Sequence, residues 1–342
     1  MRRFLPGQRG LTRGGLLVAV ALLAAACGRP PATNVPSPET PAPLPSQPSP
    51  PSPQPTPPSR EVAGRRDCTW IAVVLDNSIP ARPQSGVSLA SVVYEFPTEG
   101  MITRLLAFFC EQAPQTVGPV RSLRTYMLEI AREYNAVVVH SGGSKSALAA
   151  VRSGAGPTIN EFWQPKPFWR VRGRPRPHNL YTSIPALRPY LPKVAKAPVE
   201  HWETVPTSPA PLPVSIEIPY AVGYHVRFDY NPATNRYRRY VAGKEAIDAL
   251  TAQPVEVSAV IVQYARWGQT YEGTTLTSRL DLEGEGRIVL FAGGRRTEGY
   301  WKRRGPGRTQ FTDLQGRPLQ LPPGTVWVSI VPHTQSVRWH AR

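Results

Sequence analysis

The sequence predicts an α/β domain, with a mixed sheet and helices, followed by a β-rich α+β domain. Between residues 67 and 205, apolar strand-like runs alternate with segments of helical periodicity. Between residues 206 and 342, most apolar segments alternate with period two, as half-buried strands do. The two segments are unlike each other, so we expect two different domains and no internal repeat.

The elements expected in the first domain follow from its apolar runs. Four runs predict strands: "WIAVVLD" (70–76), "SVVYEFP" (91–97), "TRLLAFFC" (103–110) and "AVVVH" (136–140). "GVSLA" (86–90) predicts a short helical turn. Apolar residues at three- and four-residue spacing predict a helix over 122–134. A second helix is expected over Lys145–Arg152, stopped by Gly154 and Gly156.

The second domain begins after a cluster of prolines and small residues between Pro192 and Pro213. One helix, Lys244–Thr251, is expected to interrupt its strands, and Trp301 and Trp327 are expected in its core. Eight segments predict the strands: "VSIEIP", "YHVRFDY", "RYRRYV", "VEVSAVIVQYA", "RIVLFA", "EGYWKR", "TQFTD" and "TVWVSIVP".

The N-terminus has the pattern of an export signal. Four arginines precede the apolar run Leu16–Ala26, which is shorter than the roughly 20 residues that a membrane-spanning helix needs. Residues 1–26 are therefore expected to be a signal peptide. Cys27 directly follows three alanines, a pattern that looks like a bacterial lipobox, so we expect Cys27 to be lipidated. The alternative is an ordinary signal peptide with an incidental cysteine.

A proline-rich tether is expected over residues 27–66. From Gly28 to Pro58 the chain is mostly proline, serine, threonine and alanine, which cannot bury a core. In an extended form of about 3.1 Å per residue, it spans on the order of 100 Å. We therefore expect a lipid-anchored protein on the outer face of the cytoplasmic membrane.

The chain is strongly basic, with a formal net charge of +17, or +13 once the four arginines of the signal are removed. Such a charge suits nucleic acid, anionic lipid or an acidic wall polymer. Export and the lack of nucleic-acid-binding motifs argue against nucleic acid. No cofactor is expected, and no metal site, because the sequence has no HExxH motif or clustered His and Cys spacing.

Two cysteines remain after Cys27. Cys68 opens the first strand of the α/β domain and Cys110 closes the third. If these strands are antiparallel neighbours, the two cysteines lie side by side. In an oxidising compartment this favours a structural disulfide over two buried thiols.

Polar residues gather where the apolar strands end, which is where open α/β sheets place their sites. The paired N–H donors of an arginine guanidinium group fit the two oxygens of a carboxylate or phosphate group. The alternative is that the arginines of this region form ion pairs with Glu95, Glu99, Glu129 and Glu133 and only hold loops in place. The candidate ligand-binding residues outside the turn after His140 are Arg82, Arg104, Arg121, Arg124 and Asn179.

The turn "HSGGS" (140–144) completes the candidate site. Gly142 and Gly143 allow positive φ, and Ser144 is placed to cap the following helix. Backbone N–H groups at such a helix N-terminus form an anion site, so we include Gly142, Gly143 and Ser144 among the ligand-binding candidates. A plain capped turn is the alternative.

Catalytic candidates are His140, His178 and Ser144. Ser141 or Ser144 would act as a nucleophile if the loop carrying His178 folds over the sheet. No aspartate is evidently placed to orient either histidine.

Three long motifs carry a family resemblance: "LDNSIPARPQSGVSLASVVYEFPTEGMITRLLAFF", "VGPVRSLRTYMLEIAREYNAVVVHSGGS" and "RPHNLYTS". The stretch "GYWKR…TQFTDLQGRPLQLPPGTVWVSIVP" matches a second domain. Together they resemble the YerB family of bacterial lipoproteins, over nearly all of the chain beyond the tether. The resemblance implies an N-terminal domain over 67–205 and a C-terminal domain over 206–342. Ser91 departs from the aspartate expected there.

The family's molecular function is uncharacterised, so the resemblance implies architecture and location but no reaction. From the residues we expect binding of an anionic envelope ligand, such as a cell-wall polymer or a small anion. Alternatives are an envelope hydrolase or transferase using His140 or His178 as acid/base, or a non-catalytic partner of wall or export machinery.

Overall fold

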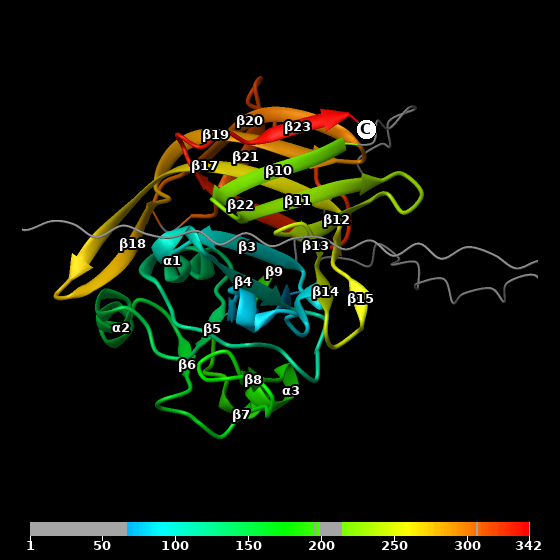
Figure 1. The fold of residues 1–342 in the computed structure, drawn as a ribbon. Helices are drawn as coiled ribbons and strands as arrows, with labels where there is room; N and C mark the ends of the chain where they lie inside the picture. Colours follow the sequence, from blue (N-terminus) through cyan, green and yellow to red (C-terminus); the bar gives the residue numbers. More distant parts are fainter. Residues whose placement is uncertain (1–66, 195, 199–213, 306, 342) are drawn as a thin grey trace, which may run out of the picture. The chain divides into compact units, whose positions relative to one another are not determined.

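The structure, a computed structural model, describes residues 67–194, 196–198, 214–305 and 307–341 (Figure 1). The predicted signal peptide, Cys27 and the tether lie outside the described residues. The boundary predicted between residues 205 and 206 lies outside them as well and stays a prediction. Within the described ranges, no helix is long and apolar enough to cross a membrane.

The first part of the chain forms a mixed sheet with helices, as predicted. Its strands lie in the order β3-β4-β2-β5-β6, where β2, β5 and β6 are parallel and β4 is antiparallel to both β2 and β3. The elements are β2 (Ile71–Asp76), β3 (Val92–Pro97), β4 (Thr103–Phe109), α1 (Thr125–Glu133), β5 (Val137–His140), α2 (Lys145–Arg152) and β6 (Thr158–Asn160).

Strands from the second part extend this sheet to eleven strands (Figure 1). The junction is β22, which pairs in parallel with β3 from Val326 opposite Val92 to Ser329 opposite Glu95. The added strands are β17 (Ala259–Glu272), β18 (Thr275–Asp281), β19 (Gly284–Ala292), β20 (Arg295–Arg303), β21 (Gln310–Asp313) and β22 (Val326–Pro332). The two parts of the sequence therefore share one hydrogen-bonded sheet.

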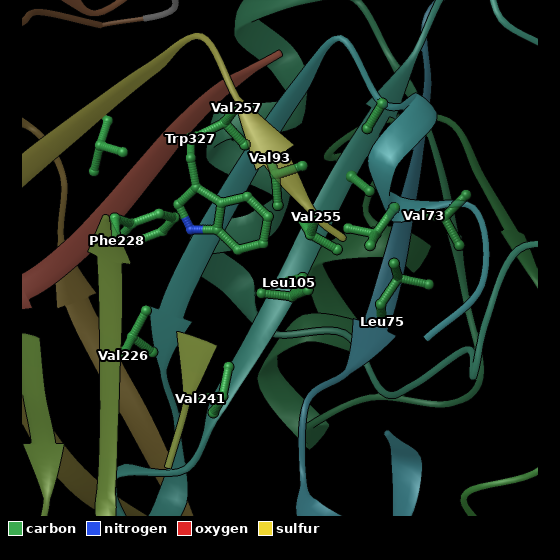
Figure 2. Close-up of a cluster of buried hydrophobic side chains, with 14 of the residues drawn as sticks. Val73, Leu75, Val93, Leu105, Val226, Phe228, Val241, Val255, Val257 and Trp327 are labelled. Carbon is green, nitrogen blue, oxygen red and sulfur yellow. The ribbon is translucent and has the colours of Figure 1, made fainter. Parts of the chain in front are cut away.

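A second sheet covers one face of the first. It consists of β10 (Val214–Ala221), β11 (Tyr224–Asn231), β12 (Arg236–Val241), β13 (Lys244–Glu245), β16 (Glu256–Val257) and β23 (Arg338–Ala341). Figure 2 shows Val226 and Phe228 of β11 facing Trp327 and Val93 of the large sheet. The Phe228 and Trp327 rings pack edge to face, with their centroids 5.9 Å apart. Trp327 and Trp301 are both buried, as predicted for core residues.

Helix α1 covers the opposite face of the large sheet. Tyr126, Met127 and Ile130 form one apolar cluster with Ala72 and Val74 of β2, whereas Val73 and Leu75 belong to the cluster on the other face of the sheet. Because both faces of β2 are covered, the strand is apolar throughout rather than alternating. This explains why the sequence shows continuous apolar runs in the first domain.

The remaining short elements lie at the edges of the two sheets. Paired short strands are β1 (Asp67–Cys68) with β9 (Ala197–Pro198), β7 (Phe168–Arg170) with β8 (Leu180–Thr182), and β14 (Ile247–Asp248) with β15 (Gln253–Pro254). The helical turns are η1 (Ile79–Ala81), η2 (Val87–Leu89), η3 (Glu99–Met101), α3 (Ile184–Leu187) and η4 (Arg188–Tyr190).

The helix predicted over Lys244–Thr251 is wrong: this stretch contains β13, β14 and a turn. Its conformation is set by long-range contacts of Asp248. The fully buried carboxylate of Asp248 accepts hydrogen bonds from the backbone N–H groups of Gly86 and Ser88, 2.9 and 2.8 Å away. It also accepts one from the N–H of Leu250. Local helical propensity cannot compete with this tertiary anchor.

The predicted disulfide is confirmed. Strands β2 and β4 are antiparallel neighbours, with Ile71 opposite Phe109. This register brings Cys68 and Cys110 together, with their Cα atoms 5.8 Å apart, and the two sulfurs are bonded.

Removing the disulfide by a Cys68→Ser, Cys110→Ser double substitution is expected to lower the free energy of unfolding by about 3–4 kcal/mol. The bond closes a loop with a sequence separation of 42, which restricts the unfolded chain. Urea denaturation with and without reductant measures the effect. Reductant should move the wild-type midpoint to that of the variant, and an unchanged wild-type midpoint would contradict the bond's contribution.

Candidate functional site

Three parallel strands end at one edge of the large sheet and place polar residues there. Strand β2 ends at Asp76, β5 at His140 and β6 at Asn160. The carboxyl edge of parallel strands is where open α/β sheets hold their ligands. The loops that follow these strands therefore form the candidate site.

Asp76, at the end of β2, is 3% exposed. Its Oδ2 atom lies 3.1 Å from the Nε of Arg121 and 2.7 Å from the Nδ1 of His178. Its Oδ1 accepts a hydrogen bond from the backbone N–H of Ser78 at 2.9 Å. Burial alone would raise the pKa of Asp76, but the hydrogen bonds from Ser78 and His178 and the charge of Arg121 outweigh it and lower that pKa. The carboxyl group is therefore ionised.

The ionised Asp76 fixes the orientation of both of its partners. A carboxylate only accepts hydrogen bonds, so the Nδ1 of His178 carries a proton and its Nε2 is the acceptor of the neutral ring. Among the described residues, none hydrogen-bonds to this Nε2 or to the two Nη atoms of Arg121. The side chains of His178 and Arg121 are 18% and 26% exposed, and none of these three nitrogens is fully buried.

The aspartate at this site corrects the sequence analysis, which found none to orient a histidine. Asp76 ends a strand that was predicted, but its partner His178 lies 102 residues further along the chain. The two serines considered as partners of His178 have other partners: Ser141 Oγ donates to Glu161, and Ser144 Oγ accepts from the N–H of Ala147. The serine at this histidine is Ser78, whose Oγ lies 3.2 Å from the same Nδ1 atom.

Arg82 lies on the loop after β2. Its Nε and Nη2 donate to the backbone carbonyl of Asn77 at 3.0 and 2.7 Å, and its guanidinium lies over the Tyr224 ring. Together with Arg121, which reaches Asp76 from the segment before α1, Arg82 gives this edge two guanidinium groups and one carboxylate.

A second polar group lies on the adjacent loops. Glu161 accepts hydrogen bonds from Ser141 Oγ at 2.7 Å and from Arg170 at 2.8 Å. Arg170 also donates to the side-chain carbonyl of Asn179, whose amide donates to the backbone of Val171. Asn179 therefore holds the loop that carries His178.

Arg104 and Arg124 are engaged by Glu99, as the alternative interpretation of the arginines predicted. Arg124 donates to both carboxylate oxygens of Glu99 at 2.8 Å, and Arg104 lies 3.8 Å from one of them. Although burial opposes it, these cations lower the pKa of Glu99 to about 2. The other expected acceptors lie elsewhere: Glu129 and Glu133 both bind Arg303.

The turn at residues 140–144 has the predicted cap. Gly142 adopts a φ of 62°, and Ser144 Oγ accepts a hydrogen bond from the N–H of Ala147 at the start of α2. His140 is fully buried, with its Nδ1 2.7 Å from the carbonyl oxygen of Gly142. Burial lowers the pKa of His140 to about 4, so its ring is neutral at pH 7 and holds the turn.

The N-terminus of α2 already holds a carboxylate from within the chain. Glu272, at the end of β17, accepts hydrogen bonds from the backbone N–H of Ser146 at 3.2 Å and from its hydroxyl group. Burial raises the pKa of Glu272, but the hydrogen bonds from Ser146 and Lys145 outweigh it and lower that pKa. An external anion at Gly143 and Ser144 would have to compete with Glu272.

Among the described residues, no three His, Cys, Asp or Glu side chains lie together in a way that could hold a metal ion. Arg121 and His178 supply a forked cation and a ring nitrogen, both oriented by the buried carboxylate of Asp76.

Comparison with known proteins identifies two matched regions. Residues 59–197 match the N-terminal domain of a family described as "Protein of unknown function (DUF3048)", and residues 216–328 match its C-terminal domain. The chain is 34% identical over 277 residues to the Bacillus subtilis (strain 168) protein named "Putative lipoprotein YerB". This alignment covers 77% of the chain and 81% of that protein.

The fold is similar to the crystal structure of the YerB protein from Bacillus subtilis. The TM-score is 0.69 at 29% sequence identity, and the match covers 80% of this chain and 94% of that chain. The fold class predicted from the sequence agrees with this neighbour.

Stability is expected to fall as the pH decreases from about 6.5 to about 4, partly because of His140. The unfolded chain takes up a proton on this residue near pH 6.5, whereas the native state resists protonation down to about pH 4. In urea denaturation between about pH 6.5 and pH 4, a His140→Gln variant should lose less free energy of unfolding than the wild type. His225→Gln, at an exposed histidine, is the control and should lose as much as the wild type. Equal pH slopes for wild type and His140→Gln would contradict the assignment.

Proposed function

This chain belongs to the family of proteins that carry the two DUF3048 domains, and we propose that it is a lipid-anchored protein that binds an anionic cell-envelope ligand. The ligand site that we propose is formed by Asp76, Arg121 and His178. The relative's name, a lipoprotein, supports membrane anchoring. The run Leu16–Ala26 and the cysteine that follows support Cys27 as the lipidated residue, on the outer face of the cytoplasmic membrane.

One observation carries the ligand proposal: a single buried carboxylate orients two cationic or hydrogen-bonding side chains and leaves their outer nitrogens unengaged by described residues. Ordering Arg121 in advance reduces the entropy lost when a ligand binds. Two parallel Nη donors fit both oxygens of a carboxylate or phosphate group. The Nε2 of His178, on the ring that Asp76 binds through Nδ1, can accept a hydrogen bond from a hydroxyl group of the ligand.

The charge balance also favours an anion. Asp76 is outnumbered by Arg82 and Arg121, and the pair Glu161 and Arg170 on the next loop is neutral. A positive site on a lipid-anchored protein faces an envelope rich in carboxylate and phosphate groups. Arg104, Arg124 and the turn at Gly142, Gly143 and Ser144 are not part of the proposed site, because partners within the chain already engage them.

A second candidate function is proton transfer by His178. The contact of 2.7 Å between Asp76 Oδ2 and His178 Nδ1 favours it, since it leaves Nε2 as the nitrogen of the ring that can accept a proton from a ligand. Ser78 contacts Nδ1 rather than Nε2, so the nucleophile would be water or a ligand hydroxyl group. This candidate requires turnover of the bound ligand, and the scaffold alternative requires no small ligand.

The proposal is tested by a thermal-shift experiment on the mature full chain. The probes are inorganic phosphate and a disaccharide with one carboxylate, N-acetylglucosaminyl-N-acetylmuramic acid. At one hundred times its Kd, a ligand should add about 2.7 kcal/mol to the free energy of unfolding. Arg121→Ala should abolish the shift. Arg266→Ala, at an exposed arginine on β17, should not change it.

The results separate the candidate functions. A shift that needs Arg121, with the probe recovered intact, supports binding. Consumption of the disaccharide that stops in His178→Ala supports proton transfer. The absence of a shift with either probe contradicts the ligand proposal and favours a protein partner.

A further inference from the structure

We propose that the anionic group bound at Asp76, Arg121 and His178 belongs to a saccharide whose ring packs on Phe162 and Trp163. This inference rests on the proposed function and specifies its ligand class. It starts from two large aromatic side chains at the surface, one of which, Trp163, has the Arg152 guanidinium 5.9 Å from its ring centroid. Phe162 is 70% exposed and Trp163 is 50% exposed.

The aromatic pair is held in place by Asn160, the last residue of β6. The side-chain oxygen of Asn160 accepts hydrogen bonds from the N–H groups of Phe162 and Gly142, at 3.2 and 3.0 Å. Its backbone carbonyl accepts from the N–H of Trp163 at 2.9 Å. The turn is therefore fixed by hydrogen bonds, although its side chains are exposed.

The lack of a side chain at Gly142 leaves room for the Phe162 ring. A Cβ atom at this position would lie 2.9 Å from Cε2 of Phe162, closer than carbon atoms pack. The φ of 62° at Gly142 also favours glycine. The turn after β5 thus has a second role besides capping α2, because it leaves room for the Phe162 ring.

The same turn connects the aromatic pair to the anion site. Glu161 precedes Phe162 and accepts the hydrogen bond of Ser141 Oγ. The backbone N–H of Ser141 donates to the carbonyl oxygen of Arg121 at 3.0 Å. Two hydrogen-bonded steps therefore join the aromatic residues to Arg121.

The surroundings of the pair fit a sugar. The faces of aromatic rings carry partial negative charge and attract the polarised C–H groups of a pyranose ring. Ser141, Glu161 and Arg170 supply donors and acceptors for hydroxyl groups. Two aromatic side chains with polar neighbours match one or two sugar rings, whereas a stable protein interface covers about 800 Å² on each partner.

Isothermal titration calorimetry on the mature full chain tests the inference with three probes. They are inorganic phosphate, the acidic disaccharide N-acetylglucosaminyl-N-acetylmuramic acid, and the neutral disaccharide N,N'-diacetylchitobiose. We expect the acidic disaccharide to bind at least tenfold more tightly than either other probe. Phe162→Ala and Trp163→Ala should each weaken its binding about tenfold and leave phosphate binding unchanged.

Tyr300→Ala is the matched control. Tyr300 lies on β20 and is also 50% exposed, so its loss should change no affinity. Because Phe162 and Trp163 are exposed, their variants should keep the wild-type melting temperature, which shows that the fold is intact.

Two outcomes overturn the inference in different ways. If the acidic disaccharide binds no better than phosphate, and Trp163→Ala has no effect while Arg121→Ala abolishes binding, the saccharide inference fails and the proposed anion site stands. If no probe binds the wild-type chain, the proposed function and the inference fail together.

Discussion

A buried ion pair between Glu95 and Arg239 joins the two parts of the chain. Glu95 is fully buried and Arg239 is 2% exposed, and one Nη of Arg239 lies 2.9 and 3.1 Å from the two carboxylate oxygens. Trp327 donates its indole N–H to Glu95 and stacks its ring against Arg239. Since an unpaired charge in this core would cost several kcal/mol, the two sheets must keep their register.

The same pair fixes the loop that carries the candidate site. Asn77, next to Asp76, donates its amide to Glu95, Thr103 and Tyr224, and accepts a hydrogen bond from Gln84. Its backbone carbonyl in turn holds Arg82. The direction in which β2 ends, and with it the position of Asp76, is therefore set by a charge network deep between the sheets. The loop of the proposed anion site is therefore hydrogen-bonded directly to the core through Asn77.

Much of the fold could be predicted from the sequence, because strands buried on both faces leave continuous apolar runs, as in β2. The disulfide followed from the antiparallel pairing of two such runs. Contacts between residues far apart in the sequence could not be predicted from local patterns. Arg239 lies 144 residues from its partner Glu95. Asp248 binds the backbone of Gly86, and this contact gives a turn where the local sequence predicts a helix. Arg121, at the start of a predicted helix, and His178, in a proline-rich loop, were candidates from the sequence, but the carboxylate between them required the tertiary structure.

A double-mutant cycle on Glu95 and Arg239 tests the central claim most directly. Urea denaturation would give the free energy of unfolding of Glu95→Gln, Arg239→Met and the double variant. Each single change should cost about 3–5 kcal/mol, because it leaves a buried charge or an unmet donor. The double variant should cost at least 1 kcal/mol less than the sum of the two, since neither charge remains. Costs that add to within about 0.5 kcal/mol would contradict a network that depends on this pair.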